Sequence, residues 1–295
     1  MEKISLMTMS MFMRPFFVFK VDHDLENLKD NYEEILDMSR NAGFTAVDVT
    51  SWEIDLMGPS HVQETLARHG LSVSSLIWFG EYGQVDPEGF DLRVARGKQG
   101  VDTALALGTD IFMAVPQAQK DIEKYTPQEI HQAMAKHWQP ITAYAREKNI
   151  HVVVEDTPDL RLHFCKAEDV RAVLDRVPGL ELVYDSANMI LVGEDPLAYV
   201  KAFAGRIGYV HLKDYRPAPA GSRFGEVAQD GTSMSTAPTG TGVIDLKAVA
   251  ASLREAGYEG RVSVEFAVDD DQNFVKSLAR SHDYAMALWQ NKAAL

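Results

Sequence analysis

Four apolar segments of the chain each end on a side chain that could bind a metal ion or transfer a proton. These side chains are Glu155 after VVV in VVVED, Asp185 in LVYD, His211 after IGYV in IGYVHLKD, and Glu265 after VSV in VSVEF. His211 follows its apolar run without an intervening turn, which places it at the carboxyl end of a strand. One such residue would ordinarily cap a helix or hydrogen-bond a loop. Four of them together indicate a common site.

One imidazole and three carboxylates form a hard, oxygen-rich donor set. Such a set suits Mn²⁺, Mg²⁺ or Co²⁺, whereas a structural zinc site would contain thiolates and more imidazoles. We therefore expect a divalent metal cofactor, Mn²⁺ before Mg²⁺ or Co²⁺. A metal that polarises a substrate carbonyl acidifies the neighbouring C–H, and a carboxylate within reach can then remove the proton.

The elements that must position these residues alternate along the chain between strands and helices. Strands are expected at 4–11, 45–50, 71–79, 110–116, 151–155, 180–185, in the segment that begins at 207, and at 262–266. A helix with apolar residues at helical spacing follows each strand. Thr126 with Glu129, Ser60 with Gln63, and Asp195 before Pro196 predict helix starts. This alternation predicts a parallel sheet covered by helices.

A closed (β/α)8 TIM barrel of the α/β class is the natural form of such a sheet. The alternative is an open doubly wound sheet, but no Gly-rich dinucleotide fingerprint follows the first strand. In barrel enzymes the active site lies at the carboxyl ends of the strands, where all four candidate ligands are expected. Strands five and eight lie apart around the ring. Glu155 and Glu265 should therefore approach a substrate from different sides, as an acid/base pair.

Length and composition exclude several protein classes. One barrel domain spanning 1–295 can accommodate the 295 residues. The net charge of −14 argues against nucleic acid as a partner, because binding to phosphates requires Lys and Arg. The only cysteine, Cys165, cannot form an intramolecular disulfide and fits a cytoplasmic location. The apolar N-terminus is interpreted as a first strand rather than a signal peptide, and no run reaches the roughly 18–20 apolar residues of a membrane span.

One long loop interrupts the regular pattern. Residues 217–241 are rich in Gly, Pro, Ser and Thr, and they leave the strand that carries His211. Loops of this length are commonly functional. We expect a lid over the metal face or a surface that docks a partner chain, with Arg223, Phe224 and Glu226 choosing the substrate. An exposed insertion without a role is the alternative.

On these residues the chain resembles the sugar phosphate isomerase/epimerase group with the xylose-isomerase-like barrel. That group includes ketose 3-epimerases, hydroxypyruvate isomerases, inosose dehydratases and endonuclease IV. The resemblance covers essentially the whole chain, and its most specific part is the set Glu155, Asp185 in YDSAN, His211 in HLKD and Glu265 in VEF. This set looks like the family's metal quartet. The resemblance implies a carbohydrate substrate and gives Glu155 and Glu265 a double role as ligands and acid/base pair.

The chain departs from the epimerases at positions that bind substrate in that group. Asn188 stands where they place a histidine, and their arginine position is Pro217 here, with Arg216 one residue short. The long insertion and the GTG at 240–242 look closer to the inosose dehydratases. The barrel also serves as the catalytic subunit of C-glycoside-cleaving enzymes, so a small partner subunit or a homo-oligomer is left open.

Several further residues could contact the substrate. Lys213 alternates in phase with His211 and should also point into the barrel, where it could steady an oxyanion or pair with an acid. Trp52 and Trp78 accompany strands two and three and could wall a sugar pocket or belong to the core. With Asn188 and Arg216, these residues form the expected substrate-binding set.

We expect first a metal-dependent isomerase or epimerase that moves a proton through an enediolate of a sugar-like hydroxyketone. The alternative is a lyase of the same barrel, either an inosose-type dehydratase or a C-glycoside-cleaving catalytic subunit, that uses this enediolate to expel a leaving group. An endonuclease IV-like DNA repair enzyme is disfavoured, because its three metals would need more strand-end histidines. A barrel that only binds is a further alternative, against which the intact Glu155 and Glu265 argue.

Overall fold

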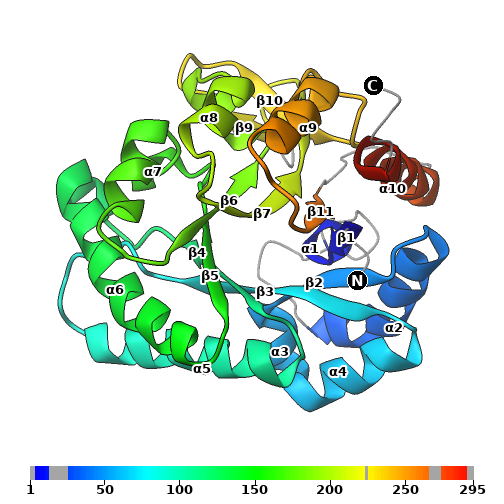
Figure 1. Cartoon of the computed structure of the whole chain (residues 1–295), viewed down its shortest axis with the longest axis horizontal. Helices are drawn as coiled ribbons and strands as arrows, with labels where there is room; N and C mark the ends of the chain where they lie inside the picture. The colour runs from blue at the N-terminus through cyan, green and yellow to red at the C-terminus, as the bar shows by residue number, and fades with distance from the viewer. Residues whose placement is uncertain (1–3, 13–25, 223–224, 266–273, 291–295) are drawn as a thin grey trace.

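The chain folds into a closed barrel of eight parallel strands, as the alternation predicts (Figure 1). The computed structural model describes residues 4–12, 26–222, 225–265 and 274–290. Neighbouring strands follow the ring order β1-β11-β7-β6-β5-β4-β3-β2. The barrel strands are β1 (Ile4–Met7), β2 (Ala46–Thr50), β3 (Ser72–Gly80), β4 (Ile111–Pro116), β5 (His151–Glu155), β6 (Glu181–Asp185), β7 (Ile207–Leu212) and β11 (Val262–Val264).

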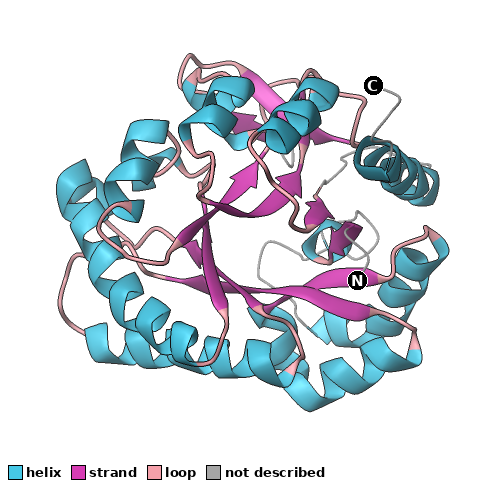
Figure 2. Cartoon of the chain, in the orientation of Figure 1, coloured by secondary structure: helices cyan, strands magenta, loops and turns pink. Residues whose placement is uncertain are grey.

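Helices surround the barrel and cover its outer face (Figure 2). The main ones are α2 (Glu26–Asn41), α3 (Ser51–Met57), α4 (Pro59–Arg68), α5 (Phe90–Ala106), α6 (Pro127–Glu147), α7 (Ala167–Leu174), α8 (Pro196–Ala202), α9 (Leu246–Glu255) and α10 (Phe274–Gln290). The Thr126 side chain accepts a hydrogen bond from the Glu129 amide at the start of α6, and Asp195 accepts from the Ala198 amide at the start of α8. Two of the three predicted helix starts are therefore confirmed.

The structure differs from the sequence prediction at two points near the N-terminus. Strand β1 ends at Met7 rather than Met11, because the Thr8 amide and hydroxyl both donate to the Asp48 carbonyl and the chain turns into a short helix, α1 (Met9–Phe12). The second difference concerns the capping box predicted at Ser60 and Gln63, which is wrong. Helix α4 starts without a side-chain cap, and Gln63 donates instead to the Ala106 carbonyl.

The capping box lies one helix earlier, at the start of α3. The Glu53 carboxylate accepts hydrogen bonds from the backbone N–H and the hydroxyl of Thr50, at 2.6 and 2.9 Å. Strand β2 therefore passes into a helix without a loop, and this direct connection places Trp52 at the carboxyl end of the barrel.

The segment predicted as an irregular insertion contains a small antiparallel sheet. Its strands are β8 (Asp214–Pro217), β9 (Gly225–Val227) and β10 (Ser233–Ala237), in the order β8-β10-β9. Tyr215 and Met234 from this sheet pack on Ala187 and Leu191. The segment is therefore more regular than the sequence predicts, and it packs on the barrel instead of forming a core of its own. Arg223 and Phe224 lie outside the described residues.

Asp214 holds the residues that follow β10 against the end of the barrel. Its carboxylate accepts hydrogen bonds from the backbone N–H groups of Gly240, Gly242 and Ile244, at 3.2, 2.8 and 3.1 Å. A Cβ at position 242 would come within 2.2 Å of the Asp214 carboxylate, so glycine is required there. The small sheet is thus fixed over the end of the barrel at both of its ends.

Side chains of the barrel strands alternate between two cores, because successive residues of a strand point to opposite faces. The interior core consists of Met7, Ile77, Ile111, Met113, Val153, Val183 and Tyr209. The larger outer core lies between the strands and the helices and includes Trp78, Phe112 and Tyr184. Among the described residues, no helix is long and apolar enough to cross a membrane.

Candidate metal centre

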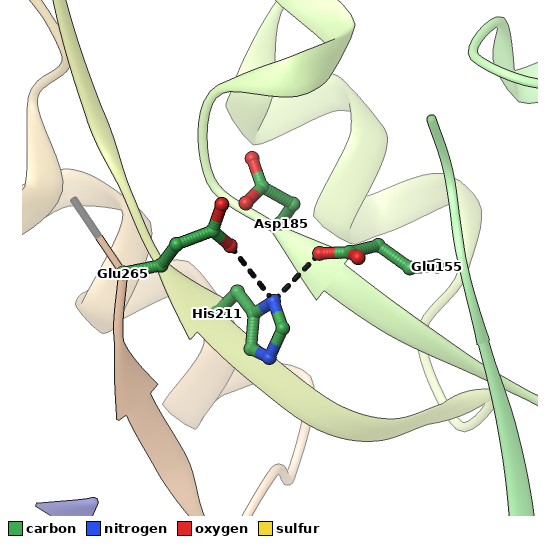
Figure 3. Close-up of side chains that lie close together, drawn as sticks. All are labelled: Glu155, Asp185, His211 and Glu265. Carbon is green, nitrogen blue, oxygen red and sulfur yellow. Dashed lines mark hydrogen bonds and ion pairs between the residues drawn. The ribbon is translucent and has the colours of Figure 1, made fainter. Parts of the chain in front are cut away.

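The quartet lies together at the carboxyl end of the barrel interior and consists of Glu155, Asp185, His211 and Glu265 (Figure 3). Its members come from the ends of four consecutive strands of the ring, β5, β6, β7 and β11. The first three follow interior core residues by two positions, and these core residues are Val153, Val183 and Tyr209. Residues two apart on a strand share a face. One ligand atom from each member lies within 4.8 Å of the others.

His211 is contacted by two carboxylates of the quartet. Its Nδ1 lies 2.6 Å from Glu155 Oε1 and 3.0 Å from Glu265 Oε2 (Figure 3). The approach of the two glutamates to a substrate from different sides stays a prediction; in the structure both of them reach one ring nitrogen. The reason is that only two strands separate β5 from β11 on this side of the ring.

Asp185 is held by the backbone that follows it. Its Oδ1 accepts hydrogen bonds from the N–H groups of Ala187 and Asn188, both at 2.8 Å, while Oδ2 has no hydrogen-bond partner among the described residues. Burial raises the pKa of Asp185 to about 7. The Lys213 ammonium lowers this pKa, and the carboxylates of Glu265 and Glu155 raise it. The site thus concentrates negative charge that a cation would stabilise.

Lys213 supplies positive charge beside the quartet. Its Nζ lies 2.9 Å from Glu265 Oε1 and donates to Asn188 Oδ1 at 3.2 Å. Burial raises the pKa of Glu265, but Lys213 and His211 more than offset this effect, and the pKa falls to about 2. The sequence leaves two roles open for Lys213, to steady an oxyanion or to pair with an acid. The structure shows the pair with Glu265. Asn188 also donates to the Asp156 carbonyl at 3.0 Å, so both the oxygen and the nitrogen of its side-chain amide form hydrogen bonds.

The donor set fits a divalent metal ion. Three anionic oxygen donors and one imidazole nitrogen are buried within one small volume, and burial of like charges is costly without a cation. A single Nδ1–H cannot donate well to two carboxylates at once, yet Glu155 and Glu265 both contact this nitrogen. Asp185 Oδ2 and Glu265 Oε2 accept no hydrogen bond within the described part of the chain. A metal ion would satisfy these groups together.

A cavity of about 530 Å³ opens directly above the quartet, within the usual size range of ligand pockets. Glu155 and Glu265 line it and are 8% and 9% exposed, whereas Asp185 and His211 are fully buried behind them. The small sheet contributes Tyr215, Glu226 and Thr236 to the wall, and Trp52 contributes from α3. The two glutamates are therefore the quartet members that a bound molecule would meet.

The structure separates the expected substrate-binding residues into two groups. Lys213, Asn188 and Trp52 line the cavity, and their contact with substrate stays a prediction. The prediction that Trp78 contacts the substrate is wrong. This side chain is 2% exposed, faces the outer core, and packs 6.4 Å from the Phe112 ring. Arg216 is misplaced as well: it is exposed on β8, because its neighbour Tyr215 takes the face that points into the cavity.

Sequence reasoning missed Phe79, which forms the aromatic wall that Trp78 was expected to form. Its ring stacks on Trp52, with ring centroids 4.8 Å apart and an interplanar angle of 22°. The available signal was the alternation of β3, since Ile77 belongs to the interior core and Phe79 follows it by two residues. Residue type alone suggested Trp78 for the cavity wall. The alternation of side chains along β3 instead directs Phe79 to the interior face.

Asp48 was also missed, although an acid inside an apolar strand is unusual. It lies on β2 in the segment AVDVT, is fully buried, and accepts a 2.6 Å hydrogen bond from the Tyr209 hydroxyl below His211. The signal in the sequence was a charged residue in a run that otherwise predicts a buried strand.

In comparisons with known proteins, a family model matches most of the chain and a curated enzyme matches part of it. The model of the xylose isomerase-like TIM barrel family matches residues 36–285. The inosose dehydratase of Lacticaseibacillus casei is 33% identical over 90 residues, which are 29% of this chain and 30% of that enzyme. The match to this curated relative thus spans less than a third of its length.

Two solved structures share the fold over most or all of their length. The IOLI protein with a bound zinc atom has a TM-score of 0.75 and 16% sequence identity, and the similarity covers 100% of both chains. The D-psicose 3-epimerase of Clostridium cellulolyticum H10, solved with D-tagatose, has a TM-score of 0.70 and 9% identity, over 88% of this chain and 94% of that one. At these identities the likeness concerns the fold.

Proposed function

The chain belongs to the xylose isomerase-like TIM barrel family, and from this premise we propose that it is a divalent-metal-dependent enzyme acting on a sugar-like hydroxyketone. The observation that carries the proposal is the buried Glu/Asp/His/Glu quartet at the floor of a cavity of about 530 Å³. The names of similar proteins, a dehydratase of an inosose and a ketose epimerase, support a carbohydrate substrate.

Glu155, Asp185, His211 and Glu265 would hold the metal, with Mn²⁺ favoured by the three oxygen donors and Mg²⁺ or Co²⁺ as alternatives. The IOLI protein, which shares the fold, binds a zinc atom, and this supports a divalent cation as cofactor. When bound, the cation would polarise the substrate carbonyl and make the adjacent C–H more acidic.

The two glutamates that line the cavity would transfer the proton. Glu265 is ionised across the neutral range, because Lys213 and His211 lower its pKa to about 2. Its carboxylate would accept the proton of the C–H that the cation makes more acidic. Glu155 contacts the same Nδ1 of His211 and would return a proton to the carbon or to a leaving oxygen. Lys213, held between Glu265 and Asn188, would stabilise negative charge that develops on a substrate oxygen.

The fate of the enediolate decides the reaction class. We favour the lyase, in which the electron pair left by the proton expels a neighbouring hydroxyl as water, because the curated relative is an inosose dehydratase. The sequence alone favours an isomerase or epimerase over the lyase. Epimerisation remains the second candidate, supported by the fold shared with the D-psicose 3-epimerase.

The charges around the cavity favour a substrate without a phosphate group. Two cationic side chains line the cavity among the described residues, and each is already paired. Arg161 contacts Asp159 at 2.6 Å, and Lys213 contacts Glu265 at 2.9 Å. Glu226 adds a further carboxylate to the wall. A phosphate dianion would face more carboxylates than available cations, whereas hydroxyl groups can donate hydrogen bonds to these carboxylates.

Incubation in deuterated water tests the proposal. The metal-loaded protein is mixed with inososes and with unphosphorylated ketoses, and the products are followed by NMR and mass spectrometry. Loss of water with one substrate class supports the lyase, and deuterium incorporation with an unchanged formula supports the epimerase. Absence of both exchange and turnover with every polyol ketone would contradict the proposal, as would cleavage of abasic DNA under the same conditions.

A further inference from the structure

We infer that Asp48 is a positioning residue for His211: it accepts the Nε2–H of the imidazole and thereby directs Nδ1 into the quartet. The inference rests on the proposed metal site. It concerns a residue of β2, outside the quartet and outside the described lining of the cavity.

The geometry brings the two groups together below the site. His211 Nε2 lies 3.6 Å from Asp48 Oδ2, and both residues are fully buried. This separation is about 0.6 Å longer than a typical N–H···O hydrogen bond. On the opposite side of the ring, Nδ1 lies 2.6 Å from Glu155 Oε1. Neither Nε2 nor Oδ2 has a hydrogen-bond partner in the part of the chain that the structure describes.

Asp48 is held in place through its other oxygen. Oδ1 accepts hydrogen bonds from the Tyr209 hydroxyl at 2.6 Å and from the Ser5 hydroxyl at 3.3 Å. The Tyr209 hydroxyl also lies 2.6 Å from the Ser74 hydroxyl. Side chains from four strands, β1, β2, β3 and β7, thus form one polar network inside the barrel, and the network leaves Oδ2 as the oxygen available to His211.

The chemistry of an imidazole ligand requires such a partner. Metal binding through Nδ1 needs a lone pair on that nitrogen, so the proton of the neutral ring must reside on Nε2. In a buried site that N–H needs an acceptor, and a carboxylate both fixes the ring and increases the basicity of the coordinating nitrogen. Asp48 is the carboxylate that the structure records at Nε2.

The principal variant is Asp48→Asn, which preserves shape but allows an amide N–H to face Nε2. An amide donor would favour the tautomer with the proton on Nδ1, and this tautomer cannot coordinate through Nδ1. We expect the affinity for Zn²⁺, measured by competition with a chelator, to fall about 10- to 100-fold. In the Zn²⁺-saturated protein labelled with ¹⁵N-histidine, the Nε2–H resonance of His211 should also shift and exchange faster with solvent.

The matched control is Ser263→Ala. Ser263 pairs with His211 in the register of β11 and β7, and its buried hydroxyl has no hydrogen-bond partner among the described residues, so it is the alternative neighbour of the ring. This variant should leave both the Zn²⁺ affinity and the Nε2–H resonance unchanged. If Asp48→Asn does not fold, Tyr209→Phe serves instead. It removes the 2.6 Å hydrogen bond to Asp48, so it should lower the affinity and shift the same resonance by smaller amounts.

The outcomes separate this inference from the proposed function. Weaker Zn²⁺ binding together with an altered Nε2–H signal in the Asp48 variant supports the inference. If the wild-type chain binds Zn²⁺ and Asp48→Asn matches it in affinity and in the resonance, the positioning role is refuted and the metal site stands. If the Ser263 variant alone changes the resonance, Ser263 is the acceptor and the inference is likewise refuted. A wild-type chain that binds no divalent ion refutes both.

Discussion

Replacement of Lys213 by methionine should destabilise the metal-free protein far more than the metal-bound one. Lys213 is 6% exposed and its Nζ lies 2.9 Å from Glu265 Oε1. The substitution leaves the Glu265 carboxylate buried beside Glu155 and Asp185 without its nearest cation. A divalent ion held by the same carboxylates would supply the missing positive charge, so the cost should fall when the ion binds.

The expected size follows from the burial of the pair and the length of the chain. Removing one partner of a buried ion pair costs about 3–5 kcal/mol. A chain of 295 residues has an unfolding entropy of about 0.6 kcal/mol per kelvin, so the Tm should drop by about 5–8 °C. Thermal unfolding is followed by circular dichroism in EDTA and again with saturating Mn²⁺. Lys247→Met, which removes an exposed lysine of α9, is the control and should change the Tm by less than about 1 °C.

Two results would refute this reasoning. A Tm drop in EDTA no larger than that of Lys247→Met would mean that Lys213 does not compensate the buried carboxylates. An equal drop with and without Mn²⁺ would mean that no cation binds next to Glu265.

Three further predictions concern proton transfer, pH and the cavity wall. Glu155→Gln and Glu265→Gln should each lower the rate of deuterium exchange into substrate by about 10²- to 10⁴-fold; unchanged exchange would exclude that glutamate as acid or base. Burial raises the pKa of Glu53 from 4.5 to about 7, so the folded state binds the proton more tightly. Proton binding by Glu53 makes its full contribution to the free energy of unfolding below pH 4.5. This contribution, about 3 kcal/mol, is lost as the pH rises through 7. Glu53→Gln should remove this part of the decline in Tm between pH 5 and pH 8, and an unaltered pH dependence would contradict the assignment. Phe79→Ala, which removes the ring stacked on Trp52, should raise KM by up to about tenfold and leave metal affinity unchanged; a loss of metal instead would show that Phe79 supports the quartet.

The fold was predictable because its signals are local and repeat along the chain. Each strand is a short apolar run, and helix starts such as Thr126 with Glu129 and Asp195 with Pro196 carry their own capping chemistry. The alternation of these elements leaves few topologies open. The small sheet at β8, β9 and β10 was not predictable in this way. Its strands are short, β10 is rich in Ser and Thr, and the sheet is stabilised by contacts with Ala187 and Leu191, which are distant in sequence.

The positions of the quartet were predictable for a related reason. A strand end at the carboxyl face of a barrel fixes both the depth and the direction of its side chain, so Glu155, Asp185, His211 and Glu265 had to converge if the barrel closed. Residues beyond the strand ends were harder to place. The choice of Trp78 over Phe79 was an error of phase, since one residue along a strand reverses the face.

Contacts that depend on the closed ring were beyond prediction from sequence. Asp48 and His211 are far apart in the chain and come from β2 and β7, which are not neighbours in the sheet. Only the interior of the finished barrel brings them together. The same holds for Arg216, whose exposure follows from the pairing of β8 with β10 rather than from its distance to His211 in sequence.

The metal content of the chain with and without its buried ligands shows whether the quartet is a metal site. Wild-type protein, His211→Ala and Asp185→Ala are loaded with Mn²⁺, dialysed, and analysed by elemental mass spectrometry, and folding of each is verified by circular dichroism. The assignment of the quartet as a metal site predicts one tightly held divalent ion per chain in the wild type and loss of that ion in both folded variants. Equal metal content in all three proteins, or no bound ion in the wild type after loading with Mn²⁺, Mg²⁺, Co²⁺ or Zn²⁺, would contradict it.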